Sequence, residues 1–422
     1  MHRAAPDTSG DCEATPSAPR DGAPPIPPEP LVADASSLWM LDPEIDFLNH
    51  GSFGALPRSV SARQEEWRRR VEARPIEMLG RRCRELLGPA REAVAGLVGA
   101  SPADIGFVTN ATGGINAVLR ALPLRAGDVL ATTTHVYNAV RQTMRFVARQ
   151  AGAEYRELPV PPPFAHPDAI VDAIDAALDE RVRLLVVDHI SSPTAVVFPV
   201  ERIVARCRER GIDVLIDGAH APGMVPLELE RLGAAYYAAN LHKWMCAPKG
   251  CAFLWTRRDR QAHVHPATIS HFLDQGYATE FDWQGTRDIS AWICAADAIA
   301  FMRGLGLERV MAHNHALATW VQAHLCGRWG VQPLTPLDGS LLGSMATVRL
   351  PSAFQPGGPF ATFESINLAL YERFRIEVPV VEWQGVRHVR PCCQVYNRPE
   401  QYERLADAVL ALARSGADAA RS

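Results

Sequence analysis

The sequence lacks the features that would point to nucleic acid or a membrane. Its 47 acidic and 43 basic residues leave a net charge of -4 and form no long block of one sign, so no basic footprint for a polyanion stands out. No segment approaches the roughly 18 apolar residues that a membrane span needs, and no signal sequence opens the chain. These absences predict a cytosolic protein with no nucleic-acid or membrane partner.

Motifs for metals and nucleotides are also missing. The nine cysteines form no CxxC pair, so we expect reduced thiols, with neither a zinc site nor a disulfide framework. No GxGxxG or GxxxxGK[ST] segment marks a dinucleotide or NTP loop. What the chain does have is length: 422 residues, 47% of them hydrophobic, can bury one large core and a smaller second one.

Apolar segments alternate with amphipathic helices along much of the chain. The strand-like "VRLLVVDHI" and "DVLIDGA", for example, flank the helix-like "PVERIVARCRERG". Fully apolar strands between such helices indicate an α/β fold with a mostly parallel sheet covered on both faces. The C-terminal part, with strand candidates "GSMATVRL" and "HVRPCCQVY", predicts a smaller α+β domain. The predicted units are a disordered proline-rich leader over 1–36, an N-terminal arm or lid over 37–60, a large domain over 61–300, a small domain over 301–415 and a tail over 416–422.

One lysine lies where a lysine cannot easily reach water. Lys243 follows an apolar run and precedes another in "AANLHKWMCAPKGCAFLW", while Asp217 ends a buried strand. "TNATGGIN" leads a third strand into a helix whose N-terminus suits a phosphate. Since polar residues at the carboxyl ends of parallel strands share one rim, these groups fit pyridoxal 5'-phosphate. Lys243 is the predicted Schiff-base lysine, and Asp217 would keep the pyridine nitrogen protonated.

Several motifs occur in a familiar order. They are "FLNHGSFGALPRSV", "TNATGGIN", "TTTHVYNAV", "DHISSPTAVVFPV", "LIDGAHAPG", "NLHKW", "QGTRD" and "VRPCCQVYN". From about residue 45 to about 415 the chain resembles the class V aminotransferase family of fold-type I pyridoxal phosphate enzymes. It resembles most closely the isopenicillin N epimerase-like branch, which is related to cysteine desulfurases.

The resemblance implies roles around the cofactor. His135 would stack on the pyridine ring, and His220 or Ser192 would approach its hydroxyl. Thr286 would reach the phosphate of a neighbouring subunit, which predicts a homodimer. The phosphate contacts implied within the chain come from Ala111, Thr112, Gly113, Asn240 and His242.

Other residues are expected around the substrate, an amino acid or small peptide. Arg390 would bind its carboxylate by a bidentate pair. Asn49 and His50 would form a lid, although turn formation explains "NHGSFG" equally well. Tyr137 or a histidine is the candidate base for the second face of the α-carbon. Lys249 follows Lys243 too closely to share its role and is expected in a turn or at the phosphate rim.

The reaction is less constrained than the cofactor. The interval "RIEVPVVEWQGVRHVR" before the carboxylate-binding arginine holds no cysteine, and Cys392 comes after it, which disfavours persulfide chemistry. The segment instead favours an epimerase-like enzyme that removes and returns an α-proton. The alternatives are a C–S lyase or β-eliminase on a cysteine-derived substrate and an aminotransferase. Lys243, Asp217 and Arg390 argue against a cofactor-binding protein without turnover.

Overall fold

The computed structural model describes residues 26–164 and 166–419, and the side chains up to residue 415. Most of the predicted leader, residues 1–25, lies outside the described residues. Residues 26–34 form no helix or strand, and the short helix η1 (Ala35–Leu38) follows, with Ala35 buried. At the other end, α14 (Pro399–Ala419) continues into the segment predicted as a tail.

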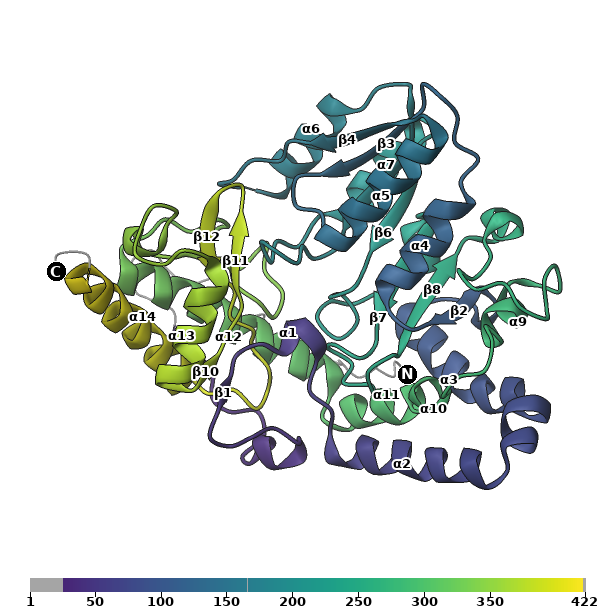
Figure 1. Ribbon diagram of the computed structural model, residues 1–422, viewed down its shortest axis with the longest axis horizontal. Helices are drawn as coiled ribbons and strands as arrows, with labels where there is room; N and C mark the ends of the chain where they lie inside the picture. Colours follow the sequence, from purple (N-terminus) through teal and green to yellow (C-terminus); the bar gives the residue numbers. More distant parts are fainter. Residues whose placement is uncertain (1–25, 165, 420–422) are drawn as a thin grey trace, which may run out of the picture.

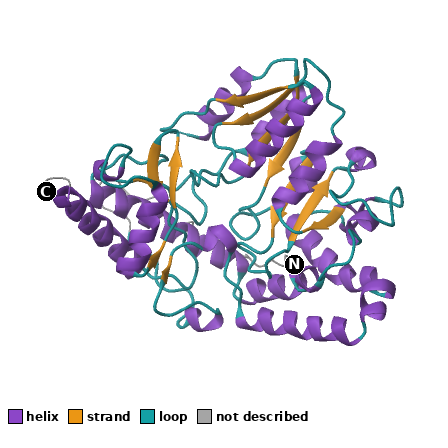
Figure 2. Ribbon diagram, viewed as in Figure 1, coloured by secondary structure: helices purple, strands orange, loops and turns teal. Residues whose placement is uncertain are grey.

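A seven-stranded sheet forms the centre of the fold, with the strand order β2-β8-β7-β6-β5-β3-β4 (Figures 1 and 2). Its strands are β2 (Ile105–Val108), β3 (Val129–Thr133), β4 (Glu154–Leu158), β5 (Val182–Asp188), β6 (Asp213–Asp217), β7 (Tyr236–Asn240) and β8 (Ala252–Thr256). The pairings among β3 to β7 are parallel, whereas β8 runs antiparallel to both neighbours. The mostly parallel sheet is therefore confirmed. The exception at β8 arises because the link 241–251 is too short for the helical crossover that a parallel pair needs.

Both faces of this sheet are covered. Leu184 and Val186 point into one apolar cluster, while Leu185 and Val187 point into the other, as successive strand residues must. Helices α4 (Ala111–Ala121) and α5 (Asn138–Ala151) cover the first face. The helices that cover the second face include α3 (Cys83–Val98), α6 (Pro167–Ala177), α7 (Val200–Glu209) and α11 (Ala295–Gly304).

A second core lies in the C-terminal part, beside the large sheet in Figure 1. Its helices are α12 (Leu307–Trp329), α13 (Phe363–Phe374) and α14, and its strands are β9 (Val348–Arg349), β10 (Ile376–Glu377), β11 (Val380–Trp383) and β12 (Val386–Val389). The N-terminal arm joins this part, since β1 (Asp46–Phe47) pairs with β10. The strand expected over "HVRPCCQVY" ends at Val389, because Pro391 has no N–H to donate to a ladder.

Short elements complete the described chain. They are α1 (His50–Phe53), α2 (Arg58–Ala73), η2 (Ile76–Arg81), η3 (Pro102–Asp104), α8 (Leu229–Leu232), η4 (Arg258–His263), α9 (Tyr277–Asp282), α10 (Ser290–Ile293) and η5 (Ser352–Phe354). Within the described ranges, no single helix is long and apolar enough to cross a membrane. One pair, Ser290–Gly304 with Leu307–Trp329, meets that criterion only jointly and is bent by 71°.

Candidate active site

A cavity of about 340 Å³ opens at the carboxyl edge of the central sheet. Strands β5, β6 and β7 end at its wall in Asp188, Asp217 and Asn240. Convergence at this edge is what parallel strand topology dictates. The lining residues are Ser52, Phe53, Thr109, Asn110, Ala111, Thr112, Tyr137, Asp188, Ile190, Ser192, Asp217, Ala219, His220, Asn240, His242, Lys243, Lys249 and Gly250.

Lys243 lies on the link between β7 and β8, and its side chain is half-buried in the cavity wall. Its amine Nζ is 3.2 Å from Nε2 of His220. Burial, followed by the positive charge of Arg390, lowers the pKa of Lys243 to about 8, although Asp217 opposes the shift. An amine with this pKa is neutral in a substantial fraction of molecules near neutral pH, as a nucleophile must be.

Asp217 has an acidic neighbour that the sequence analysis missed. Asp188 and Asp217 pair in register on adjacent parallel strands and both line the cavity. Asp217 Oδ1 accepts a hydrogen bond of 3.0 Å from the backbone N–H of Ala219, while Asp188 Oδ2 is buried without a partner among the described residues. Burial raises the pKa of both carboxyls, and the charge of Asp217 raises that of Asp188 further. The signal for Asp188 was available, because it ends the apolar run "LLVVD" as Asp217 ends "VLID".

The start of α4 forms one end of the cavity. Asn110 caps this helix by accepting a hydrogen bond of 2.8 Å from the backbone N–H of Gly113. The N–H of Ala111 donates to Asn240 Oδ1 at 2.8 Å. Of the residues predicted to contact the phosphate here, Ala111, Thr112 and Asn240 line the cavity and Gly113 does not.

Two basic residues lie near this end. His242 donates from Nδ1 to the carbonyl oxygen of Cys251 at 2.9 Å, and burial lowers its pKa to about 4. Lys249 donates to the carbonyl oxygen of Gly54 at 3.0 Å and also lines the cavity. The placement of Lys249 agrees with the expected rim position.

His135 lies outside the cavity lining, although stacking on the cofactor was predicted for it. Its Nδ1 is 2.7 Å from Oγ1 of Thr194, and its Nε2 is 2.7 Å from the carbonyl oxygen of Val160. Its ring packs against Trp383 with centroids 4.7 Å apart. Tyr137, two residues further on, lines the cavity instead and is 43% exposed. Of these two residues, Tyr137 therefore belongs to the candidate site, and His135 lies outside its lining.

The N-terminal arm reaches the site through different residues from those predicted. The Asn49 amide bonds to Glu377 at 2.9 Å, and the fully buried His50 bridges Tyr396 and the backbone of Lys243. Neither residue lines the cavity. Ser52 and Phe53 of α1 do, and the Phe53 side chain is 72% exposed at its edge. In the sequence, the signal for this position is an aromatic residue, Phe53, within the polar turn "NHGSFG".

Of the remaining predicted site residues, some line the cavity and others lie outside its lining. Ser192 and His220 line it. Arg390 is buried behind Ser192 and donates to its Oγ at 3.0 Å, while its own Nε has no partner among the described residues. Thr286 is exposed and lies outside the lining.

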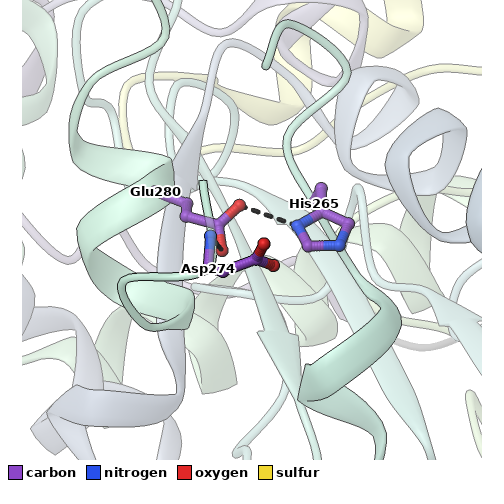
Figure 3. A group of neighbouring side chains, drawn as sticks. All are labelled: His265, Asp274 and Glu280. Atoms are coloured by element: carbon purple, nitrogen blue, oxygen red, sulfur yellow. Dashed lines mark hydrogen bonds and ion pairs between the residues drawn. The ribbon is translucent and has the colours of Figure 1, made fainter. Parts of the chain in front are cut away.

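A second polar group lies outside this cavity, on the loop before α9 (Figure 3). His265, Asp274 and Glu280 place their ligand atoms within 4.8 Å of one another. However, His265 Nδ1 is 2.7 Å from one oxygen of Glu280, and the backbone N–H of Asp274 donates to the other at 3.1 Å. The contacts of Glu280 thus fasten the preceding loop to α9.

Comparison with known proteins identifies the family. The class V aminotransferase family model matches residues 54–353. Isopenicillin N epimerase of Amycolatopsis lactamdurans is 34% identical over 400 residues, covering 90% of this chain and 98% of that protein. Putative L-cysteine desulfhydrase 1 of Oryza sativa subsp. japonica is 35% identical over 404 residues, covering 87% and 83%.

Solved structures share the fold. The cystine C-S lyase C-DES, determined with its product cysteine persulfide, has a TM-score of 0.74 at 20% identity, covering 86% of this chain and 97% of that one. The predicted fold class is thus confirmed, and the family match confirms the expected cofactor, pyridoxal 5'-phosphate. The chain belongs to the class V aminotransferase family.

Proposed function

We propose that the protein is a pyridoxal 5'-phosphate enzyme that removes and returns the α-proton of an amino acid or small peptide, in an isopenicillin N epimerase-like reaction. One observation carries the proposal: the Lys243 amine and the Asp217 carboxyl share one cavity, and the pKa of that amine is lowered to about 8. Its supports are the epimerase relative at 34% identity and the family match.

The lining residues fit the cofactor. Thr112 and the start of α4, with Asn240 and His242, would hold the phosphate. Asp217 would hold the ring nitrogen. Burial raises its pKa by disfavouring the carboxylate, and a positively charged ring nitrogen beside it would stabilise that carboxylate. When bound, the cofactor withdraws electrons from the substrate α-carbon and makes its proton acidic.

The chain's own groups must then move that proton. Lys243 supplies a neutral amine that can accept it. Inversion needs a second acid–base group, and His135 and His50 are engaged in other hydrogen bonds outside the cavity. Tyr137, His220 and His242 all line the cavity. Because His220 contacts the Lys243 amine itself and His242 is bonded to the carbonyl oxygen of Cys251, we assign the second face to Tyr137.

The test is incubation with a panel of L-amino acids and thioether conjugates in deuterated water. Deuterium incorporation at the α-carbon, chirality and oxo-acid release are read from the same samples. We expect exchange together with inversion for at least one substrate, and Tyr137→Phe should retain exchange while losing most of the inversion. Bound cofactor with no exchange on any substrate would remove the support for an epimerase.

A C–S lyase is the second candidate. Its support is the putative L-cysteine desulfhydrase at 35% identity, and β-elimination requires only the one base that Lys243 provides. In the same assay a lyase yields an oxo acid, ammonia and a released thiol or sulfide without inverted substrate. An aminotransferase would instead require an amino acceptor and convert it to a new amino acid.

We further propose a homodimer in a reducing, cytosolic compartment. Thr286 is exposed and lies outside its own cavity, as a residue serving a neighbouring subunit should. All eight described cysteines are free and buried, in keeping with a reducing environment. Light scattering of the full chain tests the dimer, and a monomer at micromolar concentration would contradict it.

A further inference from the structure

Trp244, His220 and Lys243 form a continuous polar chain into the cavity. The indole Nε1 of Trp244 is 3.3 Å from Nδ1 of His220, and Nε2 of the same imidazole is 3.2 Å from the Lys243 amine. Trp244 is fully buried, and His220 is 1% exposed. Both ring nitrogens of His220 therefore have a partner, and water has little access to either.

The identity of the first partner fixes the protons on the ring. An indole N–H can only donate, so Nδ1 of His220 must accept with its lone pair. The ring is neutral, because burial lowers the pKa of His220 well below its usual value and the charges of Lys243 and Arg390 lower it further. A neutral imidazole whose Nδ1 accepts carries its proton on Nε2. That proton faces the Lys243 amine.

We propose that Trp244 is a positioning residue that holds His220 in the Nε2–H tautomer and thereby favours the neutral, nucleophilic form of Lys243. An N–H can donate only to an amine that has a free lone pair, and an ammonium has none. The inference rests on the proposed function in one respect, that Lys243 captures the cofactor. It extends that function by assigning a role to a residue outside the cavity lining.

Removing the indole N–H should reverse the preferred tautomer of His220. In Trp244→Phe the imidazole is free to carry its proton on Nδ1, and Nε2 then accepts from a charged Lys243. The amine should become more basic. The other charged or titratable groups that affect Lys243 are Arg390, Asp217, Cys392 and Asp188, and the substitution alters none of them.

The backbone of Lys243 is held independently of the indole N–H. His50 donates from Nε2 to the carbonyl oxygen of Lys243 at 3.0 Å, and its Nδ1 accepts from the hydroxyl of Tyr396 at 2.7 Å. A phenyl ring at position 244 retains an aromatic contact with His50, whose ring centroid lies 4.8 Å from that of the indole. A change in the pH dependence of Lys243 in Trp244→Phe would therefore result from the loss of the indole N–H.

The experiment follows cofactor capture by the cofactor-free full chain. The rate of absorbance change on adding pyridoxal 5'-phosphate is measured from pH 6 to 10. We expect the midpoint of the pH profile to move upward by at least about half a unit in Trp244→Phe. Trp329→Phe is the matched control, since that buried indole donates to the carbonyl oxygen of Ala406 at 3.3 Å in the other core, and its midpoint should stay at the wild-type value.

A double-mutant cycle separates the tautomer from packing. In the His220→Gln background, Trp244→Phe should cause no further shift. An equal shift with and without His220, or no shift at all, would overturn the proposal. Absence of capture by wild type at every pH would instead count against the proposed function. ¹⁵N-histidine NMR of wild type gives a second reading that does not depend on the variant's folding: the proton of His220 is expected on Nε2, and finding it on Nδ1 would overturn the inference.

Discussion

Asp188 and Asp217 stand side by side at the carboxyl ends of β5 and β6, in register, facing the same cavity. The two carboxyls differ in their partners. Asp217 accepts a backbone hydrogen bond from Ala219, while Asp188 has a buried oxygen without a partner among the described residues. Two buried carboxyls this close do not both ionise readily, so we assign the proton to Asp188 and the charge to Asp217.

This assignment predicts opposite outcomes for two equivalent substitutions. Asp217→Asn removes the charge that we propose pairs with the cofactor nitrogen and should lower kcat/KM by about 100-fold or more. Asp188→Asn replaces a neutral acid with a neutral amide of the same shape and should change kcat/KM by less than about threefold. Steady-state kinetics of the two holoenzymes checks this. A larger loss for Asp188→Asn than for Asp217→Asn would reverse the assignment.

The raised pKa of Asp188 also predicts a pH-dependent stability. Between the ordinary carboxyl pKa of 3.8 and the raised value, the folded chain keeps a proton that the unfolded chain releases. The contribution of Asp188 to the free energy of unfolding therefore falls as pH rises through this window, by up to about 1.4 kcal/mol per unit.

Asp188→Asn should remove this dependence. Its stability relative to wild type should increase from pH 5 to pH 8, measured by urea unfolding of the cofactor-free chain. A difference that stays constant with pH would show that Asp188 ionises as readily when folded as when unfolded.

Gly54 is where the N-terminal arm touches the lysine-bearing link. Its backbone has φ of 71° and ψ of 162°, a region open essentially to glycine alone, and a Cβ there would lie 2.0 Å from the carbonyl oxygen of His242. Gly54→Ala should lower the free energy of unfolding by about 1–3 kcal/mol and displace the link that carries Lys243. Denaturant unfolding and cofactor affinity are the measurements.

Gly96→Ala is the matched control. Gly96 lies within α3, and nothing lies within 4 Å of its added Cβ. Alanine in a helix interior should raise stability by up to about 1 kcal/mol and leave cofactor affinity unchanged. Equal losses for the two substitutions would show that Gly54 has no special role.

The buried cysteines predict the absence of persulfide chemistry. No cysteine lines the cavity among the described residues, and the Cys392 sulfur accepts a hydrogen bond of 3.2 Å from the backbone N–H of Gly51. Burial raises the pKa of Cys392, which leaves it a poor nucleophile. Cys392→Ser should keep kcat within about threefold, and turnover of cysteine should leave no persulfide on the protein by mass spectrometry. Activity that disappears with Cys392 would point to a desulfurase.

Part of this site could be predicted from the sequence pattern of individual strands. Asp217 ends an apolar run and Lys243 lies between two apolar segments, and parallel topology brings the strand ends to one rim. Asn240 was predicted from the family resemblance. The resemblance implied a cofactor contact for His135, whereas Tyr137 of the same segment lines the cavity. His135 and Tyr137 differ in burial, and the side chain that faces the cavity depends on the loop after β3. No pattern in the sequence encodes that loop geometry.

Long-range packing was equally hidden. The sequence pattern places His50 in a polar turn. Its two nitrogens nevertheless bond to the backbone of Lys243 and the hydroxyl of Tyr396, 193 and 346 positions away along the chain. Asp188 ends an apolar run as Asp217 does, but its pairing with Asp217 could not be predicted, because the register cannot be read from either strand alone.

The central claim is that Lys243 binds the cofactor covalently. Borohydride reduction of the holoenzyme followed by peptide mapping tests it most directly, with Lys243→Ala and Lys249→Ala analysed in parallel. The account predicts the reduced cofactor on Lys243 in wild type and in Lys249→Ala, and none in Lys243→Ala. A label found on Lys249, or retained in Lys243→Ala, would contradict it.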